Sequence, residues 1–209
     1  RGHRVALTAR RADRLDQLAG EIVAAGGAPP IVIPCDLEQA GACDTIEAAL
    51  AAAGVEVEYL VNNAGFGIFG HAIKRDREDQ LRMIAVNVQV LTNLTLRFAD
   101  QLIRNRGGIL NLGSIAGFLP GPGMAVYYAT KAYVLSFSEA MRHELAPHGV
   151  RVTVICPGPV LTEFQARAGF SPGVDSAILK VSAAQVAQLG YDGLMAIDKT
   201  LTVGTLIAL

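Results

Sequence analysis

The sequence predicts an α/β protein with a doubly wound parallel sheet, built in three layers with helices on both faces. Short apolar segments alternate with longer amphipathic segments along the 209 residues, the order that gives parallel strands joined by crossover helices. The short segments are rich in Val, Ile and Leu without polar alternation, which indicates strands buried on both faces. Polar or glycine-containing motifs follow five of them, and ligands in such sheets bind beyond the carboxyl ends of the strands.

The apolar runs place the strands, and turn residues bound them. We expect strands at Val5–Thr8, Ile31–Cys35, Val57–Val61, Ile109–Leu112, Val150–Cys156 and Thr200–Leu209. Helical periodicity and terminal Gly or Pro residues place helices at Asp13–Ala25, Gln39–Ala53, Glu78–Arg104, Tyr127–Ala146 and Ala183–Ile197. In the first of these helices, Leu15, Leu18 and Ile22 mark the inner face, and Gly26 follows its end.

Composition favours one globular domain over residues 1–209. Hydrophobic residues make up 51% and charged residues 18%, and 18 Lys and Arg against 19 Asp and Glu give a net charge of −1. This balance gives no indication of a nucleic-acid partner or of an anionic membrane. No apolar run reaches the ~20 residues that a membrane span needs. The three cysteines lack metal-ligand spacing, so we expect no metal site and a reducing, cytoplasmic setting.

Three polar side chains near the middle of the chain suggest chemistry on a carbonyl group. Tyr127 and Lys131 are four residues apart and would share one helix face, where an ammonium lowers the pKa of a neighbouring phenol from its usual ~10. The Ser114 hydroxyl can donate to a carbonyl oxygen, so the set would supply a general acid and an orienting donor. A solvated helix face is the alternative interpretation of the Tyr-x-x-x-Lys pair.

With Gly117 three residues after the serine, this stretch resembles the classical short-chain dehydrogenase/reductase family. The resemblance covers essentially the whole chain and implies a Rossmann fold and an oxidoreductase of alcohol and carbonyl groups. It implies catalytic roles for Ser114, Tyr127, Lys131 and Asn87. Asn87 would hold a water that links the lysine to solvent, while a structural hydrogen bond is its alternative role.

Residues at the strand ends indicate the cofactor. Ala9 stands where an NAD-specific site has a carboxylate, and Arg10 follows, which favours the 2′-phosphate of NADP(H) over NAD(H). A solvated arginine is the alternative. The resemblance places Asp36 against the adenine with Leu37 beside it, although Asp36 could instead be a helix cap. The other cofactor-binding residues that it implies are Asn62, Ala64, Gly65, Tyr127, Lys131, Pro157, Gly158, Val160 and Thr162.

The NNAG stretch Asn62–Gly65 is one of these strand-end motifs, and a simple Asx turn is its alternative interpretation. The family also opens with a strand and a Gly-rich phosphate loop, and no such motif precedes Val5. That strand would lie between Val5–Thr8 and Val57–Val61, and its loss would expose two apolar strand edges. We therefore expect the natural polypeptide to carry about one further βα unit, roughly 30–40 residues, before Arg1.

The segment 163–180 occupies the place of the family's variable substrate lid. Its Phe164, Ala166, Ala168, Phe170 and Val174 suggest an apolar carbonyl compound or secondary alcohol as substrate. The long helix Glu78–Arg104 and the Tyr127 helix match family helices that build dimers or tetramers, so we expect a homo-oligomer. The competing hypothesis is a non-catalytic nucleotide-binding regulator or scaffold, because a fold does not fix a function.

Overall fold

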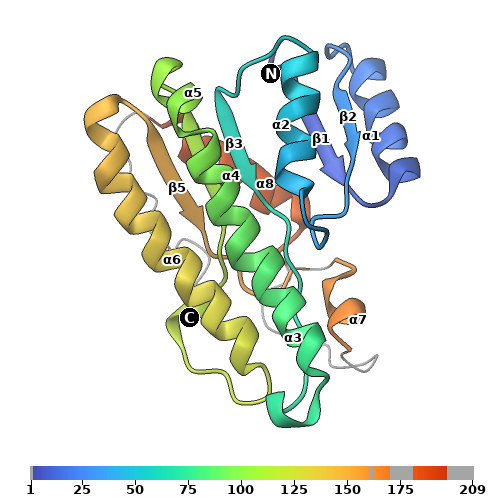
Figure 1. Ribbon diagram of the computed structural model, residues 1–209, viewed down its shortest axis with the longest axis vertical. Coiled ribbons are helices and arrows are strands. Elements are labelled where there is room, and N and C mark those ends of the chain that lie inside the picture. The colour runs from blue at the N-terminus through green and yellow to red at the C-terminus, as the bar shows by residue number, and fades with distance from the viewer. Residues whose placement is uncertain (1, 161, 170–180, 197–209) are drawn as a thin grey trace. The chain divides into compact units, whose positions relative to one another are not determined.

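The computed structural model describes residues 2–160, 162–169 and 181–196 (Figure 1). The chain forms two compact units, residues 1–56 and 57–209. We describe each unit by itself, and the expectation of a single domain stays a prediction. The expected last strand, Thr200–Leu209, lies outside the described residues, as does most of the lid segment.

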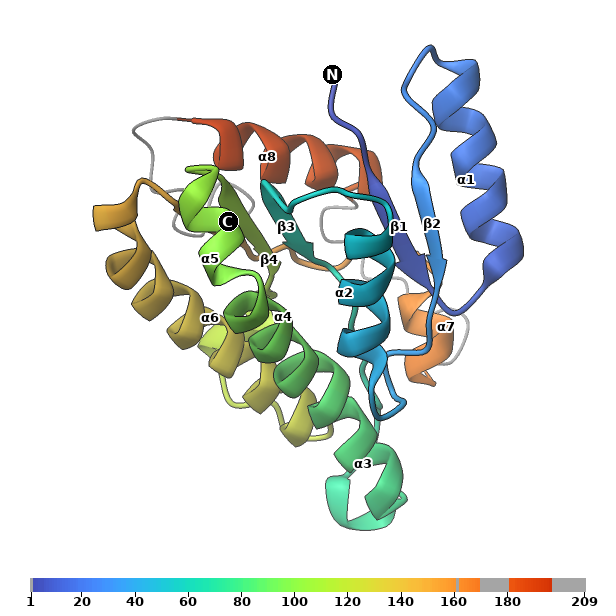
Figure 2. The ribbon, with the colours of Figure 1, turned by 45° about the horizontal axis from the view of Figure 1, so that its top comes forward.

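The N-terminal unit is a parallel βαβα arrangement. Strands β1 (Ala6–Ala9) and β2 (Ile31–Pro34) pair in parallel with Ala6 opposite Ile31, and helices α1 (Ala12–Ala24) and α2 (Ala42–Ala52) pack on them (Figure 2). The second helix begins three residues later than the sequence predicts. Gly41 adopts the left-handed conformation with φ of 81°, which ends the preceding turns before α2 can start.

The sheet of the C-terminal unit has three parallel strands in the described residues: β3 (Tyr59–Asn62), β4 (Gly108–Leu112) and β5 (Arg151–Ile155). Strand β4 lies in the centre, and its Ile109 is fully buried. Asn62 is opposite Asn111, and Leu112 is opposite Ile155, so the carboxyl ends of the strands meet at one edge. Parallel pairing confirms the predicted fold class.

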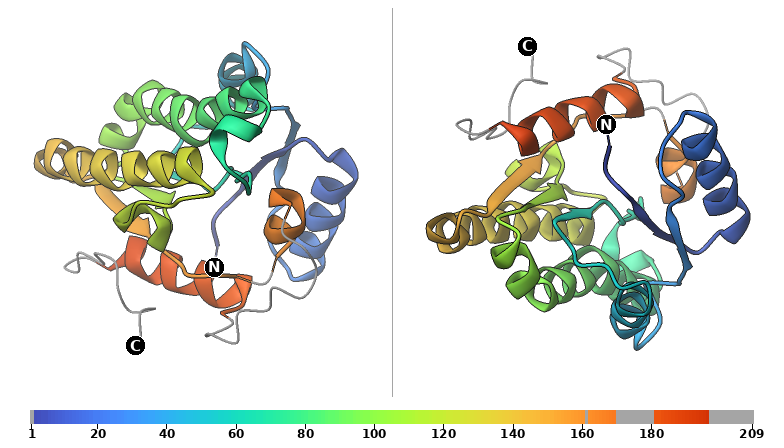
Figure 3. Two further views of the ribbon diagram at one scale, coloured as in Figure 1. Left: turned by 90° about the horizontal axis from the view of Figure 1, so that it is seen from below. Right: turned by 90° about the horizontal axis from the view of Figure 1, so that it is seen from above.

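Helices cover both faces of this sheet. Figure 3 shows α4 (Leu91–Arg97) and α6 (Ala125–Leu145) on one face and α8 (Ala183–Met195) on the other. A capping box begins α8, because the Ser182 hydroxyl accepts from the Gln185 amide while the Gln185 side chain accepts from the Ser182 backbone. The described part of this unit also contains the 3₁₀ turns Ala72–Lys74, Ile115–Phe118 and Ala146–His148 and the helix α7 (Phe164–Ala168).

The long helix expected at Glu78–Arg104 is interrupted. It consists of α3 (Arg77–Ile84), a π-helical segment (Ala85–Val90), α4 (Leu91–Arg97) and α5 (Ala99–Arg104). The Asp76 side chain caps α3 by accepting from the Asp79 amide at 3.0 Å. The wide π turn contains the buried Asn87, whose side chain is bonded to residues outside the helix. The apolar periodicity of the sequence predicts a helix here, but it does not reveal the change from α-helical to π-helical turns.

A chain of buried amides and hydroxyls joins the sheet to its helices. The Asn62 amide donates to Thr95 on α4 at 3.2 Å and to the Asn111 oxygen on β4 at 2.9 Å. The Asn111 amide donates in turn to Ser138 on α6 at 2.9 Å. All four residues are at most 7% exposed, so each polar group is compensated by a partner inside the core. Asn62 therefore has a structural role in the sheet.

Candidate active site

The carboxyl end of the central strand is fastened to the loop that follows β5. The Gly113 N–H donates to the Ile155 carbonyl at 2.8 Å, and the Ile115 N–H donates to the Pro157 carbonyl at 3.2 Å. These bonds hold Ser114 beside the start of the Pro157–Val160 motif. Two of the predicted strand-end motifs thus lie side by side, as parallel strands require.

Tyr127 and Lys131 lie in the first two turns of α6, and both are buried, with exposed fractions of 9% and 6%. The Lys131 ammonium donates to the Leu112 carbonyl at 2.6 Å and lies 5.9 Å from the centre of the Tyr127 ring. The Ser114 side chain lies close enough to the Tyr127 phenol to lower its pKa. The structure therefore brings together three of the four side chains predicted to be catalytic, and it excludes a solvated helix face.

The pKa of Tyr127 is raised, and the expectation that Lys131 lowers it is wrong for this structure. Burial of the phenol is the largest cause, and the hydrogen bond from Ser114 opposes it. Burial also lowers the pKa of Lys131 from 10.5 to about 8. The sequence shows that the two groups are close but not how deeply both are buried, and here burial of the phenol outweighs the lowering effect of Ser114.

Asn87, the fourth predicted catalytic residue, is 2% exposed, and its side chain forms three hydrogen bonds. Its side-chain oxygen accepts from the Phe66 N–H at 3.1 Å, and its amide donates to the Phe66 carbonyl at 2.9 Å and to the Thr130 hydroxyl at 3.1 Å. This is the structural role that the sequence left open as an alternative. A part in a proton relay stays a prediction.

An apolar wall surrounds the Tyr127 ring. The Phe164 ring of α7 lies 5.4 Å from it, and Phe66, Met124 and Met83 belong to the same cluster. The contact is close enough that a β-carbon on Gly67 would lie 2.9 Å from Phe164 and 3.2 Å from the tyrosine ring. Among the expected lid residues, Phe164, Ala166 and Ala168 lie in α7, while Phe170 and Val174 are outside the described residues.

The thiol of Cys156 lies beneath this set and is 5% exposed. Burial raises its pKa to about 11, against a weaker opposing hydrogen bond from the Ser114 backbone. The thiol is therefore protonated at neutral pH and acts as a small apolar group. No group of three His, Cys, Asp or Glu in the described residues could hold a metal ion.

The predicted cofactor residues of the N-terminal unit have partners of their own. Arg10 forms an ion pair with Glu38 at 3.0 Å, and the Asp36 carboxylate accepts from the Glu38 N–H at 3.1 Å. The Asp36 bond is an Asx turn, which resembles the capping role left open for this residue. Leu37 lies within that turn and is half-buried.

In the C-terminal unit, the outer cofactor residues sit in loops with defined bonds. The Val160 carbonyl accepts from the Gln165 side chain at 2.8 Å, and the Thr162 hydroxyl accepts from the Phe164 N–H at 3.2 Å. Both bonds hold α7 to the loop after β5. Gly158 is half-buried, and Ala64 is exposed. The part of each residue in cofactor binding stays a prediction.

Sequence reasoning missed two residues that contact the predicted set. Glu38 lies 28 positions from Arg10, and no sequence pattern pairs them. Thr130 bonds both Asn87 and the Tyr127 carbonyl. Its position three residues after Tyr127 was a usable signal, because that spacing puts a hydroxyl within reach of the tyrosine carbonyl on a helix.

The parallel sheets and the polar groups at their carboxyl ends define a Rossmann-like α/β protein. The family model described as short chain dehydrogenase matches residues 1–170. The chain therefore belongs to the short-chain dehydrogenase family, whose members are oxidoreductases of alcohol and carbonyl groups.

Similar proteins agree with this assignment. The chain is 37% identical over 191 residues to a sulfoacetaldehyde reductase of Chromohalobacter salexigens, an alignment covering 90% of this chain and 75% of the relative. It is 39% identical over 161 residues to the NADP-dependent 3-hydroxy acid dehydrogenase YdfG of Salmonella typhi, covering 76% of this chain and 63% of the relative. The chain thus spans less than two thirds of the second relative.

Among solved structures, the fold resembles a short-chain dehydrogenase from Sphingobium yanoikuyae in complex with NADPH. The TM-score is 0.82 at 31% identity, and the match covers 91% of this chain and 75% of that one. No helix in the described part of the chain has the length and apolar character needed to cross a membrane.

The depressed pKa of Lys131 predicts a specific pH dependence of stability. Between about pH 8, the folded pKa, and ~10.4, the unfolded pKa, the unfolded state binds more protons, so the free energy of unfolding rises with pH. Below pH 8 the cost of burying the charge is fully present. From pH 7.5 to 9.5, the wild type should gain roughly 1–2 kcal/mol relative to Lys131→Met, measured by urea unfolding. A difference that stays constant over this range would contradict a buried ammonium.

Proposed function

We propose that this protein transfers a hydride between NADP(H) and an apolar carbonyl compound or secondary alcohol. The observation that carries the proposal is the buried ammonium of Lys131 beside the buried phenol of Tyr127, with Ser114 near enough to lower the pKa of the phenol. Burying a cation is costly, so its placement needs a reason. A non-catalytic scaffold would have no chemical use for this set, which makes the regulator hypothesis the weaker one.

The residues of the C-terminal unit suit a dinucleotide. The Lys131 ammonium has three N–H donors, and Leu112 is its acceptor in the described part of the chain, which leaves donors for ribose hydroxyls. A β-carbon on Gly65 would lie 3.0 Å from the Asn87 oxygen and 3.8 Å from the Lys131 nitrogen, so the bare backbone is needed there. The residues of this unit that would hold NADP(H) are Asn62, Ala64, Gly65, Tyr127, Lys131, Pro157, Gly158, Val160 and Thr162.

In the reductive direction, Tyr127 donates the proton to the carbonyl oxygen. Its raised pKa keeps the phenol protonated at neutral pH, so it is ready as an acid. The Ser114 oxygen accepts from the Ala116 N–H at 3.1 Å, and its one proton, which is directed at the Tyr127 phenol in this structure, would turn to the same carbonyl oxygen. NADPH, when bound, supplies the hydride. Lys131 then stabilises the phenolate, and Asn87 maintains the supply of protons from solvent.

The substrate class follows from the wall around Tyr127. Phe164, Phe66 and Met124 present apolar surface, which favours a carbonyl compound with an apolar substituent. A small acid-bearing carbonyl compound is the second candidate, because the Arg167 guanidinium lies over the Phe66 ring at 5.0 Å and could meet an anionic group. The sulfoacetaldehyde and 3-hydroxy acid enzymes among the relatives support including such compounds in a screen.

Replacing Tyr127 with Phe tests the mechanism. The variant keeps the ring and its contacts but loses the proton, so kcat/KM for carbonyl reduction should fall by about 10²–10⁴. NADPH binding, followed by fluorescence titration, should change little. Turnover would be measured by NADPH oxidation across a screen of carbonyl compounds. Full activity in this variant would show that another group is the acid.

Arg10 should set the preference for NADPH over NADH, because its guanidinium can bind the 2′-phosphate that NADH lacks. Replacement with Ala should lower the kcat/KM ratio for NADPH over NADH tenfold or more, since a charge-assisted bond contributes about 1.5–3 kcal/mol. Glu38→Gln is the matched variant: it removes the present partner of Arg10 and should lower KM for NADPH. A wild type that uses NADH at least as well as NADPH would overturn the assignment.

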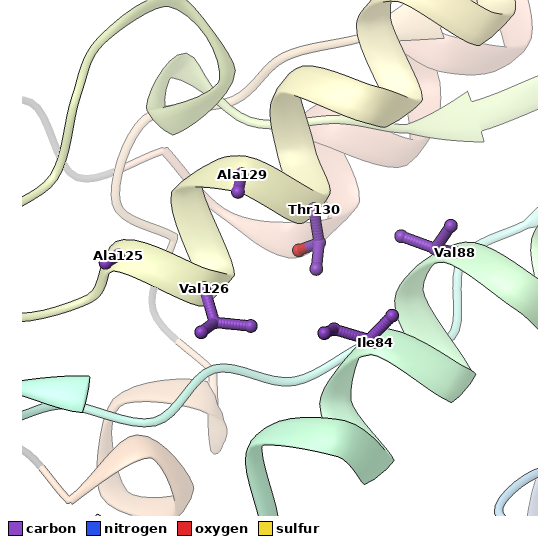
Figure 4. Close-up of a pocket in the computed structure, with 6 residues that line it drawn as sticks. All are labelled: Ile84, Val88, Ala125, Val126, Ala129 and Thr130. Atoms are coloured by element: carbon purple, nitrogen blue, oxygen red, sulfur yellow. The ribbon is translucent and has the colours of Figure 1, made fainter. Parts of the chain in front are cut away.

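We also propose that a second copy of this chain covers the outer face of α3 and α6. A hollow of about 380 Å³ lies between these helices, lined by Ile84, Val88, Ala125, Val126, Ala129 and Thr130, and Figure 4 shows Ile84 and Val126 pointing toward each other across it. Leu81 and Leu96 on the same helical run are 50% and 57% exposed. Exposed apolar surface of this kind is typical of a subunit interface.

Ala129→Arg should convert the oligomer to a monomer, because a guanidinium would enter the apolar hollow. Sedimentation velocity measures the mass, and Ala24→Arg, an exposed alanine on α1, is the control that should leave it unchanged. A wild type that sediments as a monomer at micromolar concentration would contradict the proposal.

A further inference from the structure

We infer that Thr130 is a positioning residue. It fixes the distance between the helical turn that carries Tyr127 and the loop that follows β3. The inference rests on the proposed function, because it concerns how the proposed acid is held. Thr130 is 3% exposed and immediately precedes Lys131 on α6. Figure 4 shows its side chain pointing from α6 toward Ile84 and Val88.

The hydrogen bonds around Thr130 have a forced direction. The Asn87 oxygen accepts from the Phe66 N–H at 3.1 Å, so the other end of this side chain must be the NH₂ group. One of its protons goes to the Phe66 carbonyl at 2.9 Å, and the second goes to the Thr130 oxygen at 3.1 Å. The single Thr130 proton is then donated to the Tyr127 carbonyl at 2.7 Å. Every polar atom in this path has a partner.

This path joins two segments that must keep a fixed separation for the reaction. One end is the main chain of Tyr127, and the other is the main chain of Phe66, directly after Gly65. The Phe66 and Tyr127 side chains pack in one apolar cluster, so the hydrogen bonds and the packing set the same spacing. Thr130 therefore controls where the phenol and the Lys131 ammonium lie above the loop, while touching no reacting atom.

The same arrangement of hydrogen bonds, in which a buried hydroxyl donates to a helix carbonyl and accepts from an asparagine amide, occurs again on α6 two turns further along. The Ser138 hydroxyl donates to the Val134 carbonyl at 2.6 Å and accepts from the Asn111 amide at 2.9 Å. Ser138 is 2% exposed, so its burial matches that of Thr130. It ties α6 to the sheet about 12 Å along the helix from Thr130, and its two hydrogen bonds go to Val134 and Asn111, which are outside the predicted catalytic set. Ser138 is thus an internal control for the general cost of losing such a bond.

The kinetic consequence follows from geometry. Thr130→Val keeps the shape of the side chain but leaves the Asn87 proton and the Tyr127 carbonyl without the hydroxyl between them. The first turn of α6 can then shift, and a displacement of about 1 Å at a reacting group can cost ~10²-fold in rate. Thr130→Ser keeps the hydroxyl and should restore the arrangement.

The test compares Thr130→Val, Thr130→Ser and Ser138→Ala in the full chain. We expect Thr130→Val to lower kcat about 10–100-fold, a larger factor than its change in KM for NADPH, and to move the pH of half-maximal turnover. Thr130→Ser should keep both near wild type. Ser138→Ala should lower Tm by a similar amount yet leave kcat and the pH profile unchanged. Equal effects of Thr130→Val and Ser138→Ala on kcat would overturn the inference.

Hydrogen exchange separates this inference from the proposed function. In Thr130→Val, and in Thr130→Ala should the valine variant not fold, the Phe66 amide should exchange at least about tenfold faster than in Ser138→Ala. This readout needs no substrate, so it stands even where no carbonyl compound is turned over. If the Phe66 amide exchanged at the same rate in these variants, Thr130 would not hold α6 against the loop after β3, and the inference would be wrong. Absent turnover with normal coupling would instead count against the proposed function. Sedimentation of each variant would show that the oligomeric state is the same.

Discussion

The site depends on the hydrogen bond from the Lys131 ammonium to the Leu112 carbonyl, at 2.6 Å. Leu112 is the last residue of β4, the central strand of the C-terminal sheet. A charge-assisted bond is about twice as strong as a neutral one, and a buried cation without a partner would be far more costly. The bond therefore fixes the first turns of α6 over the carboxyl end of the sheet, and with them the phenol of Tyr127.

The polar groups around α6 follow the same rule, since four buried amides and hydroxyls are bonded to neighbouring elements. Asn111 and Ser138 tie α6 to the sheet, while Asn87 and Thr130 tie it to the loop after β3. Satisfied networks of this kind hold one arrangement of the chain, because any shift leaves a buried group unpaired. The rigid frame and the apolar wall of α7 together produce a buried site in which the pKa of Tyr127 is raised and that of Lys131 is lowered.

Features that follow from the local residue pattern, such as the strands, could be predicted from the sequence. Features that follow from burial and from contacts between distant segments could not. The parallel strands and the residues at their ends could be predicted, because burial on both faces requires Val, Ile and Leu and places polar residues at the ends. The π turn around Asn87 could not, since it depends on bonds to Phe66 and Thr130. The direction in which the pKa of Tyr127 is shifted was missed for the same reason. Residue spacing shows a neighbouring charge, whereas burial of the phenol depends on the packing of the whole unit.

The central claim is that the groups held at the ends of the strands support hydride transfer to a carbonyl carbon. Reduction of a carbonyl compound with NADPH deuterated at the transferable C4 position tests it most directly, with the product analysed by mass spectrometry. We predict an alcohol one mass unit heavier, carrying deuterium on the former carbonyl carbon. A product without deuterium, formed at the wild-type rate, would contradict hydride transfer.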